Sequence, residues 1–338
     1  MKALVSQEHQ SGVQEIPRPR LSHGELLLQV TACGVCFSDV HKIRFQPLEK
    51  PTVLGHEVAG RLVESRSAKF RVGDRVVVAH HVPCGHCHYC RHGNISMCAQ
   101  FKKTNLDPGG FAELVRVPGE HVDSVAFPIP DGLGDNEASF MEPLGCCVRA
   151  VKRAGVQSSD VGVVVGLGSI GLLLMQLILH AGAECIGLDL DPSRREIART
   201  LGASATFAGT EPGFAEFVAE ATKGRGGDAV FLTAGNPRLI PTALSWLRAG
   251  GMCLVFASLH PESDVTIDWN QLYYRELNIV TSYSASPADL KEALRLLTNG
   301  SVRVAQMTGH TFPLERFDEA LAAIESRTIL KAIMTPNG

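Results

Sequence analysis

The sequence predicts an α/β protein built from an antiparallel, barrel-like β domain and a doubly wound parallel sheet. Two observations carry this prediction. Up to about residue 126, short alternating runs are broken by Gly and Pro, which is typical of antiparallel strands. From residue 161 to residue 283, short apolar strands alternate with helical segments, which is typical of a parallel sheet with crossover helices.

The first part is expected to contain strands at residues 2–5, 25–30, 58–63, 75–78 and 111–117. A Pro-rich crossing follows at residues 127–132, and a helix is expected over about 135–154. Beyond residue 283, helices near 287–298 and 314–326 and a strand at 330–334 indicate a return to the first domain. We therefore predict domain segments at residues 1–147, 148–284 and 285–338, with the first and last forming the catalytic domain.

The second part is expected to contain six parallel strands. They are predicted at residues 161–165, in the run that ends at Asp189, and at 203–207, 228–232, 252–257 and 277–283, with helices at 192–201, 214–222 and 237–247. The last strand, LNIVTSY, is uncharged and β-prone, and a bare edge of this kind invites pairing. We therefore expect a homodimer or homotetramer in which a two-fold partner covers the edge.

Composition excludes several other classes of protein. The chain has 338 residues, of which 45% are hydrophobic and 20% charged, and its net charge is -3 with scattered basic residues, so nothing indicates a nucleic-acid or membrane partner. Residues 161–183 contain no charged side chain, but five glycines in that run argue against a transmembrane helix. The N-terminus lacks an apolar signal core, so we expect a cytoplasmic protein. In that reducing compartment, ten cysteines are expected to be ligands or core residues rather than disulfides.

The segment GLGSIG joins the first strand of the second part to the helix that follows. Gly166, Gly168 and Gly171 match G-x-G-x-x-G, with Ser169 and Ile170 between them. A tight turn, close approach of the backbone to a pyrophosphate and close helix packing each require a missing side chain. The helix then points its free N–H groups at the phosphates, so we predict a dinucleotide site.

Asp189 ends the next strand 18 residues after Gly171, where a carboxylate can bind both hydroxyls of an adenosine ribose. A 2′-phosphate would meet this negative charge, so we expect NAD rather than NADP. Further cofactor contacts are expected from residues that follow strands of the sheet or flank the turn. These residues are Thr233, Ala234, Ser258 and Arg194, with Arg195 as the alternative to Arg194. For both arginines, a position on the helix surface is the competing interpretation.

Four cysteines, Cys84, Cys87, Cys90 and Cys98, lie in the loop 80–100 with the spacing C-x2-C-x2-C-x7-C. Four thiolates this close in sequence can surround one zinc ion, and a closed shell leaves no position for substrate, so this site is expected to be structural. An iron–sulfur cluster is disfavoured. The bacterial ferredoxin pattern has three residues and then Cys-Pro after the third cysteine, whereas here seven residues intervene and Ala99 follows Cys98. Interleaved histidines are competing ligands: His86, His88 and His92.

A second metal site is indicated by Cys36 in GVCFSDVHK, His56 and Glu57 in LGHEVAG, and Glu142 in EPLG. Each alone has an ordinary explanation, as a buried cysteine, a strand-end histidine or a helix-capping glutamate. Together, in a chain with a dinucleotide turn, they supply a thiolate, an imidazole and a carboxylate for a zinc ion with an open position.

The chain resembles the zinc-dependent medium-chain dehydrogenases, and within them the sorbitol (L-iditol) and threonine dehydrogenase branch. The resemblance spans the whole length and rests on GVCFSDVH, GHEVAG, the four-cysteine loop, MEPLG, GLGSIG and GLDLD. It implies a GroES-like β-barrel catalytic domain and a Rossmann domain. It also implies that Cys36 and His56 bind the catalytic zinc, with Glu57 as a ligand and Glu142 at the site that holds the metal-bound water. Two nearby residues stay open as ligands and are otherwise inward-packing helix residues: Cys146 and Cys147.

The same resemblance implies a proton path in which Ser38 passes the alcohol proton through the nicotinamide ribose to His41. Asp39 is a candidate to orient His56, with a turn-capping role as the alternative. His81 resembles a histidine near the substrate in threonine dehydrogenases, and simple packing is the alternative.

These features predict a zinc-dependent oxidoreductase that passes hydride between a secondary alcohol, polyol or hydroxy amino acid and NAD, giving the ketone. Its cofactors would be NAD and two zinc ions per chain, one catalytic and one structural. The alternatives are a zinc-independent NAD(P)H reductase of the same fold and a dinucleotide-binding protein without catalysis. The metal-ligand residues argue against the reductase, and the presence of both Ser38 and His41 argues against a protein that only binds.

Overall fold

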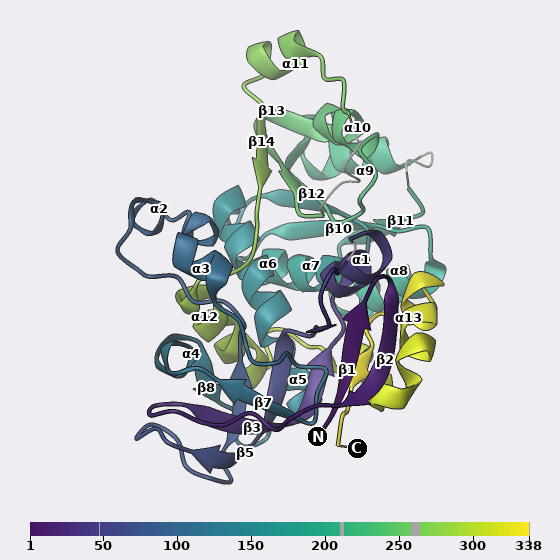
Figure 1. The fold of residues 1–338 in the computed structure, drawn as a ribbon. Coiled ribbons are helices and arrows are strands. Elements are labelled where there is room, and N and C mark those ends of the chain that lie inside the picture. Colours follow the sequence, from purple (N-terminus) through teal and green to yellow (C-terminus); the bar gives the residue numbers. More distant parts are fainter. Residues whose placement is uncertain (47, 210–212, 258–263, 338) are drawn as a thin grey trace. The chain divides into compact units, whose positions relative to one another are not determined.

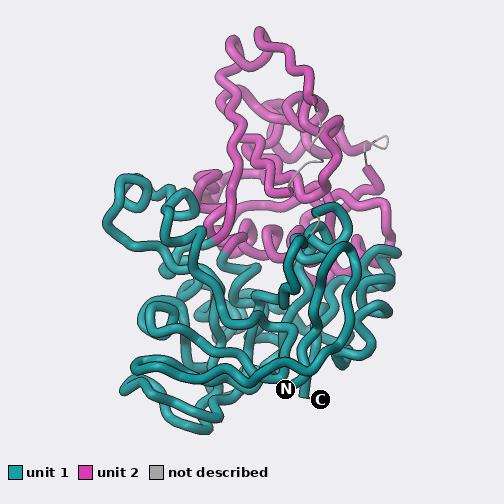
Figure 2. The backbone as a smooth tube through the Cα atoms, viewed as in Figure 1, with its two compact units in different colours: residues 1–145, 285–338 teal, residues 146–284 magenta. Residues whose placement is uncertain are grey.

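The computed structural model describes residues 1–46, 48–209, 213–257 and 264–337. The chain forms two compact units, which Figure 2 shows in different colours. Unit 1 comprises residues 1–145 and 285–338, and unit 2 comprises residues 146–284. Both ends of the chain therefore belong to unit 1.

Unit 1 is built on two β-sheets (Figure 1). Its strands are β1 (Lys2–Gln7), β2 (Gln10–Glu15), β3 (Leu26–Gly34), β4 (Thr52–Val53), β5 (Glu57–Ser65), β6 (Arg75–Val78), β7 (Leu114–Val117), β8 (Ala126–Pro128), β15 (Thr311–Phe312) and β16 (Ile333–Met334). The smaller sheet has the order β2-β1-β4, and the larger has the order β15-β16-β3-β5-β6-β8, with β7 also paired to β3. All five expected strands are present, close to their expected bounds.

β3 is the strand around which the larger sheet is arranged. It pairs antiparallel with β5, β7 and β16, and its apolar residues Leu26, Leu27, Leu28 and Val30 are fully buried. A strand covered on both faces needs such a continuous apolar run. Because β16 comes from the end of the chain, β3 holds the two sequence segments of unit 1 together.

The helices of unit 1 lie in the connections between these strands. They are α1 (Phe37–Phe45), α2 (His88–Arg91), α3 (Ala99–Lys103), α4 (Gly119–Ser124), α5 (Asp135–Ala138), α12 (Pro287–Thr298) and α13 (Phe317–Glu325), with 3-10 turns at Ile95–Met97, Ala305–Met307 and Leu314–Arg316. α12 has the expected bounds because Ser286 and Asp289 form a capping box at its start, with Pro287 in the first turn.

The single helix expected over residues 135–154 is wrong, because the chain forms α5 and then α6 (Met141–Ala154). Pro143 explains the break. Proline lacks the N–H that a continuous helix would donate to residue 139, and its ring is tolerated in the first turn of a helix. The helix therefore ends at Ala138 and restarts at Met141, which places Glu142 in the first turn of α6.

Unit 2 contains the expected six-stranded parallel sheet. Its strands are β9 (Val161–Val165), β10 (Glu184–Leu188), β11 (Ala205–Phe207), β12 (Gly227–Leu232), β13 (Leu247–Val255) and β14 (Asn278–Thr281), and its helices are α7 (Ser169–His180), α8 (Pro192–Thr200), α9 (Phe214–Ala221), α10 (Leu239–Trp246) and α11 (Trp269–Tyr274). The order is β11-β10-β9-β12-β13-β14 and every pairing is parallel, so the doubly wound topology is confirmed.

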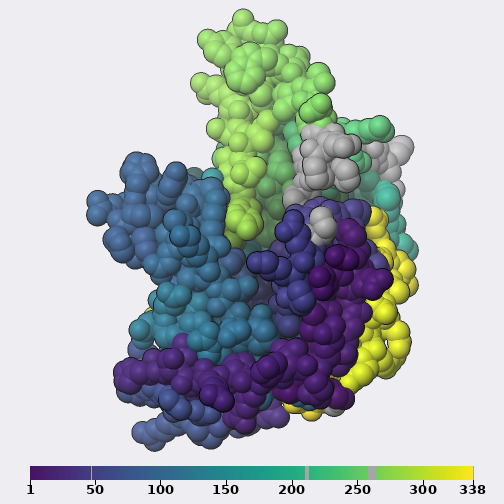
Figure 3. Space-filling model, in the orientation of Figure 1, coloured from purple at the N-terminus to yellow at the C-terminus, as the bar shows by residue number. Residues whose placement is uncertain are grey.

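β14 forms one edge of this sheet, and α11 precedes it in the chain. The aromatic side chains of α11, from Trp269, Tyr273 and Tyr274, are 74%, 70% and 79% exposed. Figure 3 shows this surface in light green. None of the helices in the described part of the chain is long and apolar enough to cross a membrane.

Candidate active site and metal centres

The glycine turn between β9 and α7 has the features that a dinucleotide requires. Gly166 has a φ of +94°, which favours glycine, and Thr233 Oγ1 donates a 2.8 Å hydrogen bond to its carbonyl oxygen. A Cβ on Gly171 would collide with the carbonyl oxygen of Gly166, so α7 can pack against the turn only with glycine there. Among the described residues, a Cβ on Gly168 would approach only Arg194, at 3.8 Å. The backbone of Gly168 is therefore accessible to a ligand.

α7 begins at Ser169 and has Gly168 as its N-cap, with no side chain capping it. The N–H groups in the first turn of a helix have no partner within that helix, and they lie at the positive end of its dipole. Ser169 and Ile170 contribute two of these groups. A pyrophosphate is the kind of anion that such an arrangement binds.

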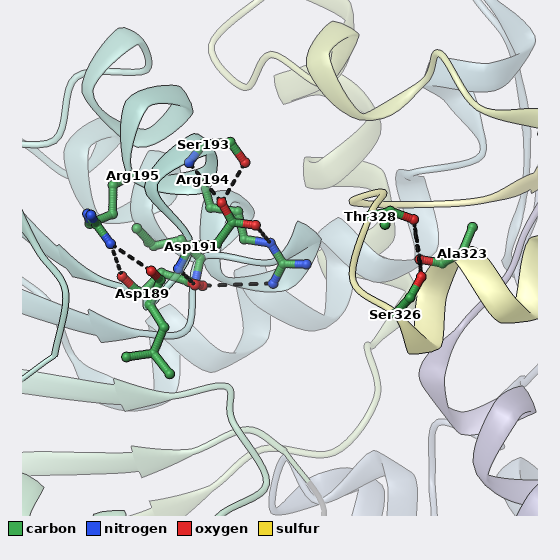
Figure 4. A network of polar contacts seen from close by, with 10 residues as sticks. Asp189, Asp191, Ser193, Arg194, Arg195, Ala323, Ser326 and Thr328 are labelled. Atoms are coloured by element: carbon green, nitrogen blue, oxygen red, sulfur yellow. Dashed lines mark hydrogen bonds and ion pairs between the residues drawn. The ribbon is translucent and has the colours of Figure 1, made fainter.

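Asp189 lies beside this turn, in the polar network of Figure 4. Its Oδ2 accepts a 2.7 Å hydrogen bond from the Leu167 N–H, and its Oδ1 accepts a 2.9 Å hydrogen bond from the Asp191 N–H. Arg194 Nη1 lies 3.8 Å from Asp189 Oδ2, and Arg195 donates to the Asp189 carbonyl oxygen at 2.7 Å. The carboxylate that should bind the ribose is thus fixed to the backbone of the glycine loop.

The other expected cofactor residues follow strands of the same sheet. Thr233 comes directly after β12, and its N–H donates to the Val165 carbonyl oxygen at 3.0 Å, next to the turn. Ala234 follows it. Ser258, expected after β13, lies outside the described residues.

Cys36, His56 and Glu57 meet in unit 1, where their ligand atoms all lie within 4.8 Å of one another. Cys36 is the N-cap of α1, and Glu57 is the first residue of β5. The β3–β5 ladder brings them together, because Gly34 at the end of β3 is paired with Glu57. His56 and Glu57 are buried, with exposed fractions of 8% and 1%.

This group fits a zinc ion. Ligand atoms about 2.0–2.3 Å from a tetrahedral zinc lie about 3.5 Å apart, so the observed spacing needs only small adjustments. Glu57 Oε2 is buried and lies 2.6 Å from Lys331 Nζ, and a carboxylate oxygen has a further lone pair that can bind a metal. A Cβ on Gly34 would collide with this oxygen, so the site exists only with glycine at position 34.

Asp39 combines the two roles considered for it, because it contacts His56 and also caps the start of α1. Asp39 Oδ1 lies 3.2 Å from His56 Nδ1, and Asp39 Oδ2 accepts a 3.2 Å hydrogen bond from the Cys36 N–H. Burial lowers the pKa of the His56 imidazole, but the Asp39 carboxylate and the Cys36 sulfur outweigh burial and raise this pKa well above its usual value. In the metal-free protein His56 therefore carries a proton that a metal ion must displace.

Lys331 is the residue of this site that sequence reasoning missed. Its Nζ lies 2.6 Å from Glu57, and the two side chains are 6% and 1% exposed. Burial lowers the pKa of the Lys331 ammonium, but the charges of Glu57, Cys36 and Asp39 raise it above its usual value. Lys331 is therefore a buried cation beside the three candidate ligands. The only signal in the sequence was a lysine within the last predicted strand.

The other expected members of this site do not join this group of ligand atoms. Glu142 is buried in the first turn of α6 and does not belong to the group whose ligand atoms meet within 4.8 Å. Cys147 is buried and its Sγ lies 3.9 Å from the Ile170 carbonyl oxygen, and Cys146 is partly buried. Both cysteines belong to unit 2 and stand outside that ligand group.

Ser38 and His41 both lie on α1, directly after the metal-ligand candidate that caps this helix. Ser38 is exposed and His41 is half-buried. His81 is held by a 2.6 Å hydrogen bond between its Nδ1 and the Thr104 carbonyl oxygen, and its ring lies 4.7 Å from that of Phe101. Packing therefore accounts for the position of the His81 ring.

The four cysteines of the loop also meet. Cys90 Sγ lies 3.5 Å from Cys87 Sγ and 3.9 Å from Cys84 Sγ, whereas a zinc ion bound by four sulfurs at about 2.3 Å separates them by about 3.8 Å. These distances exclude disulfides, in which the sulfurs are about 2.05 Å apart. Backbone N–H groups favour the thiolate, and they outweigh burial in lowering the pKa of Cys98 to about 6. The loop thus fits a structural zinc ion.

Two family models match the chain. One is described as an alcohol dehydrogenase GroES-like domain and matches residues 22–131. The other is described as a zinc-binding dehydrogenase and matches residues 169–299. Together they cover most of unit 1 before α6 and most of unit 2.

Named relatives match over 99% of the chain. A sorbitol dehydrogenase from Halalkalibacterium halodurans is 32% identical, and the match covers 99% of both chains. An L-threonine 3-dehydrogenase from Alteromonas mediterranea is 28% identical, with 99% of both chains covered. A solved structure from Sinorhizobium meliloti, titled as a zinc-binding dehydrogenase bound to NADP, has a TM-score of 0.89 and 28% identity over 99% of both chains.

These comparisons confirm the expected family, the pairing of GroES-like and Rossmann folds, and the use of zinc and a nicotinamide dinucleotide. The chain belongs to the zinc-dependent medium-chain dehydrogenase family, in its sorbitol and threonine dehydrogenase-like branch, and is an NAD(P)-dependent alcohol or polyol dehydrogenase.

Proposed function

We propose that this enzyme oxidises a secondary alcohol, polyol or hydroxy amino acid to the ketone at a zinc ion held by Cys36, His56 and Glu57, with hydride passing to NAD. The observation that carries the proposal is the meeting of a thiolate, an imidazole and a carboxylate within 4.8 Å in unit 1 of a chain whose unit 2 carries a dinucleotide turn. Three protein ligands leave a zinc ion with a position for substrate. A closed four-sulfur shell, as in the loop 80–100, does not.

Zinc at this site would acidify a bound hydroxyl, much as it lowers the pKa of bound water from about 16 towards about 7. The residues of the chain prepare the site for this task. Asp39 orients His56 through its Nδ1, which leaves Nε2 for the metal. Glu142 is proposed to hold the water ligand that the alcohol replaces.

The proton of the alcohol must also leave the site. We assign this transfer to Ser38 and His41, which both lie on α1 with Cys36 as the N-cap of that helix. An exposed serine and a half-buried histidine suit a path that ends in solvent. The nicotinamide ribose would link the two.

NAD is proposed as the preferred cofactor. Gly166, Gly168, Ser169, Ile170 and Gly171 would hold the pyrophosphate, with Thr233 supporting the turn. Ala234, Ser258 and Arg194 complete the proposed site, with Arg194 beside the adenosine ribose. Asp189 would accept hydrogen bonds from the ribose hydroxyls and repel a 2′-phosphate.

The enzyme is further proposed to be a cytoplasmic homodimer or homotetramer. β14 presents an open edge in a single chain, and pairing with a second copy would satisfy its backbone groups. The exposed aromatic side chains of α11 lie directly before this strand in the chain and would extend the buried surface.

The test measures bound zinc and turnover in the same preparations. The wild-type enzyme should hold two zinc ions per chain and reduce NAD with one of a panel of sugar alcohols, diols, cyclic alcohols and threonine. Cys36→Ser should lose one zinc ion and NAD reduction but still bind NADH, because the dinucleotide turn lies in unit 2. Cys146→Ser is the matched control and should keep both zinc ions. Full turnover after a chelator has removed both ions would contradict the proposal.

A further inference from the structure

The ion pair between Lys331 and Glu57 joins residues 274 positions apart in the chain. Lys331 Nζ lies 2.6 Å from both carboxylate oxygens, and both side chains are almost fully buried. Two buried charges lose their hydration, and an apolar pair of similar volume is often at least as stable. Stability alone therefore does not explain this pair.

The backbone brings Lys331 to the metal centre through a defined set of hydrogen bonds. β16 pairs antiparallel with β3, with Ile333 opposite Gly34, and the Val35 N–H donates to the Ala332 carbonyl oxygen at 2.9 Å. The segment that carries Lys331 is thus bonded to the segment that leads into Cys36. The backbone at the base of the Lys331 side chain is therefore fixed relative to the candidate ligand residues.

Side chains around the pair restrict it further. A Cβ on Gly34 would collide with Glu57 Oε2 and lie 2.8 Å from Lys331 Cε, so both side chains occupy the space that glycine leaves. The Lys331 ammonium also lies 5.8 Å from the centre of the Phe140 ring, within range of a cation–π contact.

Both oxygens of Glu57 lie 2.6 Å from Lys331 Nζ, so the ammonium faces the position between them at which a metal ion would bind both. The charges of the zinc-loaded site would also balance. The thiolate of Cys36 and the carboxylates of Asp39 and Glu57 supply the negative charges, and these would equal the two positive charges of zinc plus the one of Lys331. A carboxylate shared between an ammonium and a metal can give the metal only one oxygen.

We propose that Lys331 is a positioning residue for the catalytic metal, which holds the Glu57 carboxylate so that Glu57 binds the metal through one oxygen alone. This inference rests on the proposed zinc site. Without the ammonium, Glu57 can give both oxygens and occupy the position that the alcohol needs. Loss of Lys331 therefore raises the number of oxygen ligands on the metal and raises the KM for the alcohol, while NADH binding in unit 2 is unchanged.

Cadmium-113 NMR of protein in which 113Cd replaces zinc tests this directly, because oxygen ligands move the cadmium signal upfield and sulfur ligands move it downfield. The four-cysteine loop gives a second signal in the same sample and serves as an internal reference. Lys331→Met should move the catalytic signal upfield and leave the loop signal in place. Lys331→Arg, which keeps a cationic donor, should retain the wild-type position. Lys42→Met removes a cation on α1 that does not bond to Glu57 and is the matched control.

A double variant separates positioning from a structural role. In Glu57→Gln the carboxylate is gone, so adding Lys331→Met should cause no further shift if Lys331 acts through Glu57. This double variant also removes both charges together, so no unpaired charge is buried. An unchanged catalytic signal in folded Lys331→Met would overturn the proposal. A further shift in the double variant as large as the shift that Lys331→Met causes when Glu57 is present would overturn it as well. If Lys331→Met does not fold, Lys331→Arg provides the test. A catalytic cadmium signal of Lys331→Arg at the position found for Glu57→Gln would then overturn the proposal. Absence of any catalytic signal in the wild type would instead refute the zinc site itself.

Discussion

Replacement of Asp189 by asparagine should reverse or erase the preference for NAD over NADP. The substitution keeps the shape of the side chain and one acceptor for the Leu167 N–H, which now bonds to Oδ2 at 2.7 Å. It removes the negative charge that faces the ribose site. It also removes one of the carboxylates that Arg194 faces, at 3.8 Å, so Arg194 can interact more strongly with a 2′-phosphate.

The expected size follows from these contacts. A hydrogen bond to a charged group is worth about 1 kcal/mol more than a neutral one, so two ribose hydroxyls lose about 2 kcal/mol with NAD. Repulsion between Asp189 and a 2′-phosphate reaches about 4 kcal/mol at close range, but solvent and Arg194 reduce it, and we count about 1 kcal/mol. Together these effects favour NADPH over NADH by about 3 kcal/mol in the variant. The dissociation constant for NADPH divided by that for NADH should therefore fall about 100-fold.

Fluorescence titration of the purified variant with NADH and NADPH measures both constants. Asp191→Asn is the matched control, because Asp191 also lies 3.8 Å from Arg194 but caps α8, a role that asparagine fills as well. Its cofactor ratio should stay near that of the wild type. If Asp189→Asn changes the ratio of the two dissociation constants by less than about threefold, equivalent to about 0.7 kcal/mol, the Asp189 carboxylate does not discriminate between the two cofactors at the ribose.

Three further predictions concern other parts of the molecule. Gly171→Ala should weaken NADH binding and destabilise unit 2 by about 1–3 kcal/mol, because its Cβ collides with the Gly166 carbonyl oxygen, and Gly12→Ala, which has open surroundings, should leave NADH titration and thermal unfolding unchanged. Cys90→Ser should release one zinc ion and make the loop 80–100 sensitive to limited proteolysis, because few apolar side chains are buried in and beside it, among them the small cluster of Ile95, Cys98 and Phe101; a protease-resistant, one-zinc variant would contradict the structural role. Ile279→Lys on β14 should convert the oligomer to a monomer in light scattering, whereas Val72→Lys, at an exposed position in unit 1, should not; an intact oligomer in the first variant would exclude the edge as the interface.

The sheet of unit 2 could be predicted strand by strand because each of its strands is a short apolar run between clear helix and turn signals. β2 was missed for a local reason. The hairpin that joins it to β1 turns through Glu8 and His9, with φ values of 48° and 68°, and not through the Asn-Gly or Asp-Gly pair that marks such turns in a sequence. α11 was missed because its exposed aromatic face does not have the periodicity of a buried helix.

The candidate sites divide in the same way. The glycine turn and the four-cysteine loop each draw their groups from one short segment, so their spacing alone predicts the chemistry. The pairing of Asp39 with His56 could be proposed from the chemistry of metal-bound histidines, and the structure confirms the contact. Lys331 could not be found in this way, because a lysine in an apolar C-terminal strand has no local partner.

By itself, the sequence determined the parallel sheet, the dinucleotide turn, the four-sulfur loop and the residue types of the second metal site, because each depends on near neighbours or on a motif. Only the tertiary structure decided that Glu57 lies beside Cys36 and His56 and also faces a buried ammonium group. That outcome depends on the ladder in which β3 pairs with β5 on one side and with β16 on the other. In this ladder β16 comes from a segment hundreds of residues away from β3. Pairing between such distant strands leaves no regular spacing in the sequence from which it could be predicted.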